Sequence, residues 1–234
     1  MTTESSGSVR ERLAAVQARV AAAAARAGRD AATVRLLAVS KTVPLPLVRE
    51  AYAAGQRLFG ENRVQELVGK VGALPPDAEW HLIGHLQGNK ARPALACARL
   101  LHAVDSLALL DRLNRLAAAG QRQDVLLEVN ISGEASKFGL PPDVLEPVLS
   151  TAVQLPHLRC LGLMTMAPYG ADQAALHRVF GGLRDLRDRL ATRLGAPLPE
   201  LSMGMSGDFE TAIAEGATIV RVGTAIFGAR PEPT

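Results

Sequence analysis

Short apolar runs alternate along the chain with longer stretches whose apolar residues recur every three or four positions. The runs have the length of buried strands, and the longer stretches have the spacing of helices with one apolar face. The pattern predicts eight strands, at residues 34–40, 57–60, 79–83, 100–104, 124–130, 158–164, 199–203 and 218–222. Between them it predicts helices near residues 45–55, 62–72, 88–98, 106–119, 141–153, 172–194 and 207–215.

The alternation also predicts how these elements are arranged. Near-continuous apolar strands are typical of a parallel sheet, because the connecting helices cover its faces. Eight such units predict an α/β fold, a closed (β/α)8 TIM barrel, in a single domain over residues 1–234. The alternative is an open, doubly wound sheet. That alternative is disfavoured because residues 40–44, after the first strand, lack the glycines of the phosphate loop that such sheets carry.

An additional helix precedes the repeating units. Apolar residues three and four positions apart in an alanine-rich segment, ended by Gly28, predict a helix at residues 9–27. The two ends of the chain are polar or rich in proline, so we expect residues 1–8 and 230–234 to be flexible.

The composition narrows the class of protein. A chain of 234 residues, 48% hydrophobic and 21% charged, can bury a sizeable core. The net charge of +3 is dispersed and aromatic residues make up 3%, which disfavours nucleic acid as a partner. Cys97 and Cys160 lack metal-ligand spacing and are interpreted as core residues. No apolar run approaches the roughly 18 residues of a membrane span, so we expect a cytoplasmic protein without a membrane partner.

Lysine is rare in this chain, and its placement is informative. Of 26 basic residues only four are lysines, and Lys41 directly follows the first predicted strand. A desolvated lysine amine can lose its proton and attack an aldehyde, whereas arginine stays charged. Leu37 and Val39 share a strand face with Lys41, so a buried strand would give the amine an apolar setting. The alternative is a solvated lysine at a strand end.

Unusual polar residues also follow the later strands, and in a barrel the carboxyl ends of the strands meet at one mouth. Loops after the seventh and eighth strands commonly bind phosphate there. Ser206 offers a hydroxyl, and Gly223 and Thr224 offer amides and a second hydroxyl. The alternative is that Ser206 or Asp208 caps its helix. A reactive lysine together with a phosphate cradle would suit pyridoxal 5'-phosphate (PLP), which carries both an aldehyde and a phosphate.

These residues lie in longer motifs, through which the chain resembles the pyridoxal phosphate homeostasis protein family, relatives of the N-terminal barrel of alanine racemase. The segments that carry the resemblance are residues 37–42, 59–66, 80–90, 128–132, 137–139, 162–166, 201–208 and 220–228. They extend over almost the whole chain and are jointly specific. One departure is Arg63, where the family more often has an aromatic residue, and it concerns only the local helix surface.

The resemblance implies a cofactor site for PLP. Lys41 would hold the cofactor as an internal aldimine, and Ser206, Gly223 and Thr224 would bind its phosphate. Arg221 would lie beside the cofactor. The sequence leaves open whether Arg221 reaches the pyridine nitrogen or the phosphate.

Further residues within the matched motifs are expected near the mouth. The resemblance places Asn62, His81 and Met205 beside the cofactor ring. His81 is equally well interpreted as a core histidine whose hydrogen bonds are satisfied. Lys90 and Lys137 are the alternatives to Lys41 as the covalent site.

The implied function is that of a non-catalytic PLP-binding protein in intracellular vitamin B6 homeostasis, with apo PLP-dependent enzymes as recipients. Barrel racemases need a second base, a tyrosine, and Tyr169 is interpreted here as a loop residue. No catalytic residue or metal ligand is therefore expected. Two alternatives stay open: a PLP-dependent amino-acid racemase or decarboxylase, and a Schiff-base aldolase acting on a sugar phosphate. Because no exposed heptad or apolar patch is evident, we expect a monomer.

Overall fold

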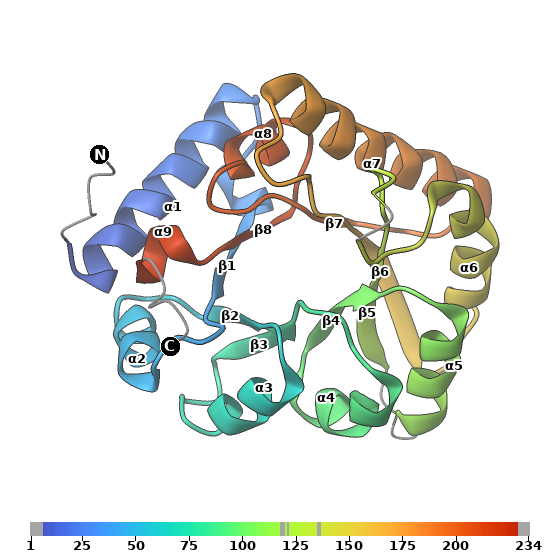
Figure 1. Ribbon diagram of the computed structural model, residues 1–234, viewed down its shortest axis with the longest axis horizontal. Coiled ribbons are helices and arrows are strands. Elements are labelled where there is room, and N and C mark those ends of the chain that lie inside the picture. Colours follow the sequence, from blue (N-terminus) through green and yellow to red (C-terminus); the bar gives the residue numbers. More distant parts are fainter. Residues whose placement is uncertain (1–6, 118–119, 121, 135–136, 229–234) are drawn as a thin grey trace.

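Eight parallel strands form a closed barrel in the computed structural model, which describes residues 7–117, 120, 122–134 and 137–228. The strands follow one another around the barrel in chain order, and the last pairs with the first (Figure 1). Their bounds are β1 Arg35–Val39, β2 Leu58–Glu61, β3 Glu79–Leu82, β4 Leu100–Val104, β5 Gln123–Glu128, β6 Leu158–Met164, β7 Glu200–Ser202 and β8 Ile219–Val222. The predicted barrel and all eight strands are confirmed, and the open sheet is excluded.

Helices surround the barrel on its outer side (Figure 1). Their bounds are α1 Val9–Arg26, α2 Leu45–Ala53, α3 Val64–Val71, α4 Ala91–Cys97, α5 Leu107–Leu116, α6 Leu145–Ala152, α7 Gln173–Leu194, α8 Phe209–Ala214 and α9 Thr224–Phe227, with short 3-10 turns η1 Ala31–Thr33, η2 Gly88–Lys90 and η3 Pro142–Val144. Each predicted helix is present. The predicted end of the fifth, at residues 118–119, lies outside the described residues, as do residues 1–6 and 229–234 of the two expected flexible ends.

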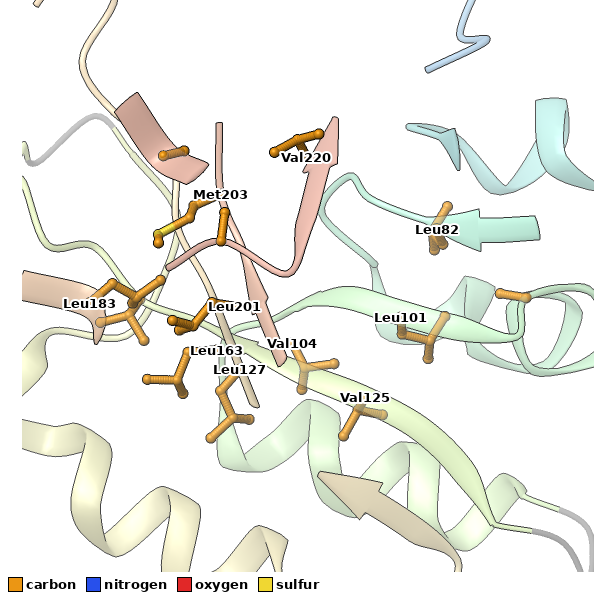
Figure 2. Packing of buried hydrophobic residues seen from close by; sticks show 14 of the residues in the cluster. Leu82, Leu101, Val104, Val125, Leu127, Leu163, Leu183, Leu201, Met203 and Val220 are labelled. Atoms are coloured by element: carbon orange, nitrogen blue, oxygen red, sulfur yellow. The ribbon is translucent and has the colours of Figure 1, made fainter. Parts of the chain in front are cut away.

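Side chains of alternating strand positions fill two separate cores. Outward-facing residues pack between strands and helices, and Figure 2 shows Leu163 and Leu201 beside Leu183 of α7. Inward-facing residues form a smaller cluster inside the barrel, which contains Leu37, Val39, Leu100, Leu126, Met164 and Ile219. Because the inner cluster is small, buried polar side chains fill the rest of the barrel interior. They include His81, His102, Ser202 and Arg221, which are described with the candidate site.

Helix α1 ties the start of the chain to its later parts. Ser8 caps the helix and forms a capping box with Glu11. Arg12 Nε donates to the carbonyl of Ile226 at 2.7 Å, and the exposed Arg19 pairs with Glu210 at 2.8 Å. The helix therefore packs against α8 and α9, across the seam where β8 meets β1 (Figure 1).

None of the helices in the described part of the chain is long and apolar enough to cross a lipid bilayer.

Candidate functional site

Lys41 lies in the turn that follows β1, at the end where the strands run out into the βα loops. Its neighbours Leu37 and Val39 belong to the inner core, as expected, and Lys41 itself is half-buried. Thr42 has a φ of 62°, a left-handed conformation that is rare for a β-branched residue. Backbone strain of this kind occurs preferentially at functional sites, where surrounding contacts impose it.

A polar network fixes the backbone on both sides of Lys41. The amine of Lys70 donates to the Ser40 carbonyl at 2.7 Å and to Glu61 Oε1 at 2.8 Å. Ser40 Oγ donates to the same Glu61 oxygen at 2.7 Å, and the Thr42 amide donates to Glu66 Oε2 at 2.7 Å. Burial raises the pKa of Glu61, and the hydrogen bonds from Lys70 and Ser40 oppose that rise. No sequence pattern predicted this network.

Ser206 brings together the loops after β7 and β8. Its Oγ accepts from the amide of Gly223 at 3.3 Å and from the amide of Ala225 at 3.5 Å. It does not cap α8. Asp208 occupies the N-cap position, but its carboxylate accepts from the Met205 amide within the same loop and makes no side-chain cap bond. The capping alternative therefore does not describe Ser206, whose hydroxyl lies at the start of α9 among converging amides.

Two glycines allow these loops to approach closely. Gly204 has a φ of 91°, and a Cβ there would lie 2.6 Å from the Ala212 Cβ and 2.9 Å from the Phe209 Cα. A Cβ on Gly223 would lie 3.2 Å from the Val39 carbonyl oxygen, just before Lys41. The lack of a side chain thus lets Gly204 pack against α8, and it lets Gly223 bring the β8 loop beside the end of β1.

Arg221 reaches inward from β8 and is only 4% exposed. Its Nη1 donates to Ser202 Oγ at 2.6 Å, and its Nη2 donates to the Thr165 carbonyl at 2.9 Å. Burial lowers the pKa of Arg221 to about 10, while the charges of Glu128 and Asp208 counteract that shift. The guanidinium remains charged at neutral pH. Its hydrogen bonds anchor it to Ser202 and Thr165, at the ends of β7 and β6, and not to the loop that holds Ser206.

A chain of hydrogen bonds continues from Arg221 through the barrel interior. Ser202 Oγ lies 2.8 Å from His102 Nδ1, and His102 Nε2 lies 2.8 Å from His81 Nδ1. His81 Nε2 then lies 2.8 Å from Glu79 Oε1. Both ring nitrogens of His81 are thus used within the barrel, as the core-histidine interpretation requires. Its contact with a cofactor ring stays a prediction.

Glu128, at the end of β5, is a further group near the mouth that the sequence did not lead us to expect. Its neighbours Leu126 and Leu127 face the inner and outer cores, so the alternation of β5 turns Glu128 inward. Burial and the nearby charge of Asp105 raise the pKa of Glu128 to about 7, although Arg221 and then His85 counteract the shift. A carboxyl group that titrates near neutrality can hold or release a proton at the mouth. The alternation within β5 was the sequence signal that could have identified it.

The rim of the mouth carries exposed apolar side chains. Met205 is 38% exposed in the loop after β7. His85 stacks on the exposed Phe138 at a centroid distance of 4.2 Å, which joins the loops after β3 and β5. The backbone of Asn62 packs against Gly84, where a Cβ would lie 2.4 Å from the Asn62 carbonyl oxygen. Tyr169 is fully exposed, as expected of a loop residue.

The remaining lysines have other surroundings. Lys70 is paired with the buried Glu61, as described above. Lys137 pairs with Glu134 at 2.9 Å, three positions away on the loop after β5. Lys90 closes the short η2 turn. Of the four, Lys41 alone combines a position directly at the end of β1 with the close approach of the Gly223 backbone.

The described residues provide no obvious metal centre. Among them, no group of three or more His, Cys, Asp and Glu side chains is arranged to hold an ion. Cys97 and Cys160 are free thiols, and burial raises the pKa of Cys160 to about 12, which keeps it protonated.

Comparison with known proteins adds the family to this geometry. The family model of the alanine racemase N-terminal domain matches residues 12–231. The chain is 46% identical to the pyridoxal phosphate homeostasis protein of Aquifex aeolicus over 222 residues, which cover 94% of this chain and 97% of that protein. It is 50% identical to the protein of that name from Pseudomonas aeruginosa over 224 residues, 95% and 96% of the two chains. The chain belongs to the pyridoxal phosphate homeostasis protein family.

Solved structures place this family member among similar barrels. PipY of Synechococcus elongatus, solved with PLP bound, is 42% identical and superposes with a TM-score of 0.85 over 94% of this chain and 100% of PipY. The alanine racemase of Corynebacterium glutamicum is 20% identical, with a TM-score of 0.72 over 94% of this chain and 62% of the racemase. The second comparison shows a shared fold alone.

Proposed function

We propose that this protein binds PLP covalently through Lys41 and serves PLP homeostasis without catalysing a reaction of its own. One observation supports the proposal: Lys41 follows β1, which pairs with β8, at the same end of the barrel as the loops after β7 and β8, where the amides of Gly223 and Ala225 converge on the Ser206 hydroxyl. An amine and an anion cradle at one mouth fit an aldehyde that carries a phosphate. The PLP-bound structure of the relative PipY supports the same cofactor.

Each part of the cofactor has a group that would hold it. Lys41 would hold the cofactor through its amine, and the cofactor would supply the electrophilic aldehyde carbon for that link. The amides of Gly223 and Ala225 and the Ser206 hydroxyl would bind the phosphate, together with Thr224. The Ser40–Glu61–Lys70 network would keep the Lys41 backbone in place.

Arg221 would face the pyridine nitrogen rather than the phosphate. The support is that its guanidinium is bonded to Ser202 and Thr165, at the ends of β7 and β6, apart from the cradle. With a pKa of about 10, Arg221 keeps its proton at neutral pH. A pyridine nitrogen beside it stays unprotonated, which weakens the ring as an electron sink and favours storage over carbanion chemistry.

A second candidate function is amino-acid racemisation or decarboxylation with the same cofactor. Glu128 favours it, since a mouth carboxyl with a pKa of about 7 could exchange protons. Against it, the fully exposed Tyr169 contacts no wall of the mouth that would aim it as a second base. Exchange of the α-proton of an L-amino acid in deuterated water, lost in Lys41→Ala, would establish this candidate and overturn the storage proposal.

The absorption spectrum of the purified, cofactor-loaded protein tests the covalent site. We expect a yellow protein whose band changes on borohydride treatment, and loss of that band in Lys41→Ala with some cofactor retained through the phosphate contacts. Lys90→Ala is the matched control and should keep the band. A colourless protein would favour the Schiff-base aldolase, and a band that persists in Lys41→Ala would move the covalent site to another lysine.

Delivery to apo PLP-dependent enzymes completes the proposal. Met205 and Phe138 at the rim are exposed to solvent, and we expect a bound cofactor to leave past them without a domain movement. We propose a monomer in the cytoplasm as the working form. Transfer is measured as the activity regained by an apo-enzyme mixed with the loaded protein, compared with the same concentration of free PLP.

A further inference from the structure

A continuous line of hydrogen-bonded side chains crosses the barrel interior. It begins at Glu79, passes through His81, His102 and Ser202, and ends at Arg221, with successive separations of 2.8, 2.8, 2.8 and 2.6 Å. His81, His102 and Ser202 are completely buried. Four strands contribute: β3, β4, β7 and β8. Storage of PLP as described above uses only the Arg221 end, so the other residues need a separate explanation.

The two ends of the line determine how its protons are arranged. An ionised carboxylate only accepts hydrogen bonds, so the His81 Nε2 must carry its proton toward Glu79. A neutral His81 then has a bare Nδ1, which accepts from the Nε2 proton of His102. The bare Nδ1 of His102 in turn accepts from the Ser202 hydroxyl. Ser202 thereby keeps an oxygen lone pair for Arg221, which can only donate.

The charges around the line favour this neutral, ordered form. Burial lowers the pKa of His81 and lowers that of His102 well below its usual value. The hydrogen bond and the charge of Glu79 partly offset this fall by raising the pKa of His81. Arg35 of β1 and Glu200 of β7 form an ion pair at 2.7 Å, and Arg35 lowers the pKa of His81 whereas Glu200 raises it. His102 is faced by Arg35, Arg221 and His81, all of which disfavour its protonation. The hydrogen bond from His81 lowers the pKa of Glu79.

We propose that Glu79, His81 and His102 are positioning residues that orient Ser202 toward Arg221, and so hold the guanidinium where the cofactor ring binds. The carboxylate of Glu79 fixes both histidines in the Nε2–H form. As a result the Ser202 hydroxyl donates to His102 and its oxygen accepts from Arg221. This inference rests on the proposed function only for the identity of the group that Arg221 meets.

The Glu79 end of the line is accessible to solvent. The side chain of Glu79 is 43% exposed, at the amino end of β3 and on the face opposite the mouth. Glu79 and Asp77 line two hollows there, of about 430 and 580 Å³. A change in the charge of Glu79 itself is therefore expected to alter the bonds of Arg221 on the other side of the barrel, whereas a charge in these hollows that is not bonded to His81 is not.

Imidazole nitrogen NMR of the cofactor-free protein tests the order of the line. In the wild type we expect both histidines to show a protonated Nε2 and a bare Nδ1 at neutral pH. The amide in Glu79→Gln has the shape of the carboxylate but can either accept a hydrogen bond from His81 or donate one to it. We therefore expect mixed tautomers of His81 and His102 and shifted guanidinium signals of Arg221. Asp77→Asn is the matched control, because it removes an equal charge from the same hollows without touching His81, and it should leave the signals unchanged.

Cofactor binding supplies the second readout. In Glu79→Gln we expect PLP to bind about three- to tenfold more weakly, because a change of that size corresponds to the net free energy of one hydrogen bond. We also expect the absorption band of the bound cofactor to shift. Ser202→Ala, which breaks the line next to Arg221, should give a similar loss. Unchanged tautomers in Glu79→Gln, or altered tautomers with unchanged Arg221 signals, would overturn the inference. Ordered tautomers in a protein that fails to bind PLP would instead refute the proposed function alone.

Discussion

Lys41 and Glu128 differ in how much of their chemistry could be predicted. Lys41 stands out in the sequence because lysine is rare and because a strand of clear period ends there. Ser206 and Gly223 were also predicted, since barrel geometry assigns their loops to the mouth. Glu128, His102 and Ser202 were not, because their roles depend on which side of the barrel wall a residue faces.

In β4 the sequence alone could not have settled that question. The pairing of β4 with β5 shifts register between Leu101 and Val104, so that strict alternation is broken. His102 and its neighbour Ala103 both belong to the interior side as a result. An irregularity of this kind reflects the fit of two strands and leaves no mark in the periodicity of one of them.

The Ser206 hydroxyl provides a prediction at the scale of one residue. Ser206→Ala removes the proposed phosphate contact together with the hydrogen bond from the Gly223 amide. We expect the variant to bind PLP about three- to tenfold more weakly, while its affinity for pyridoxal, which lacks the phosphate, stays unchanged. Spectroscopic titration with both compounds measures the difference. An equal loss for the two would show that Ser206 acts on the fold of the loop instead.

At the scale of elements, the strands were predicted closely and the helix ends less so. Buried parallel strands are apolar along their whole length, which gives a strong signal. The predicted helix at residues 207–215 begins only at Phe209, because the Asp208 carboxylate turns back to the Met205 amide. Predicted single helices at 88–98 and 141–153 each start as a separate 3-10 turn. Helix ends depend on such local bonds, which periodicity does not show.

The loop between β7 and α8 offers a matched pair of glycine substitutions. Gly204→Ala would combine a positive φ with a Cβ 2.6 Å from Ala212, whereas a Cβ on Gly207 meets nothing within 4 Å. We expect Gly204→Ala to lower the free energy of unfolding by about 2 kcal/mol or more, and Gly207→Ala to change it by less than about 1 kcal/mol. Urea unfolding of both variants measures these two changes in the free energy of unfolding. Equal effects would mean that the loop relaxes around Gly204.

At the scale of the whole molecule, buried titratable groups make stability depend on pH in opposite directions. The folded pKa of Glu128, about 7, lies above the ordinary value of 4.5, so the folded protein binds more protons and loses stability as pH rises through this window. The pKa values of His81 and His102 are lowered, so their contribution to stability is lost as pH falls below about 6.5.

The variant Glu128→Gln separates the effect of Glu128 on the pH dependence of stability from that of the two histidines. The variant lacks the carboxyl that must ionise within the barrel, while both histidines remain. From pH 4.5 to pH 8 we expect its free energy of unfolding to rise relative to the wild type by about 3 kcal/mol. Urea unfolding of the cofactor-free proteins at several pH values gives the two curves. If the difference between them is constant across this range, Glu128 is ionised throughout and the burial argument fails.

The seam between β8 and β1 also has a consequence for the newly made protein. Helix α1 packs against α8 and α9, so during synthesis α1 must wait until these later elements have been made. At roughly 5–20 residues per second that wait is on the order of ten seconds. The same late segment supplies Arg221 and Gly223. A nascent chain therefore contains Lys41 before the loops of the proposed phosphate cradle have been made, and we expect an aldehyde that reacts with Lys41 at that stage to be held without the phosphate contacts.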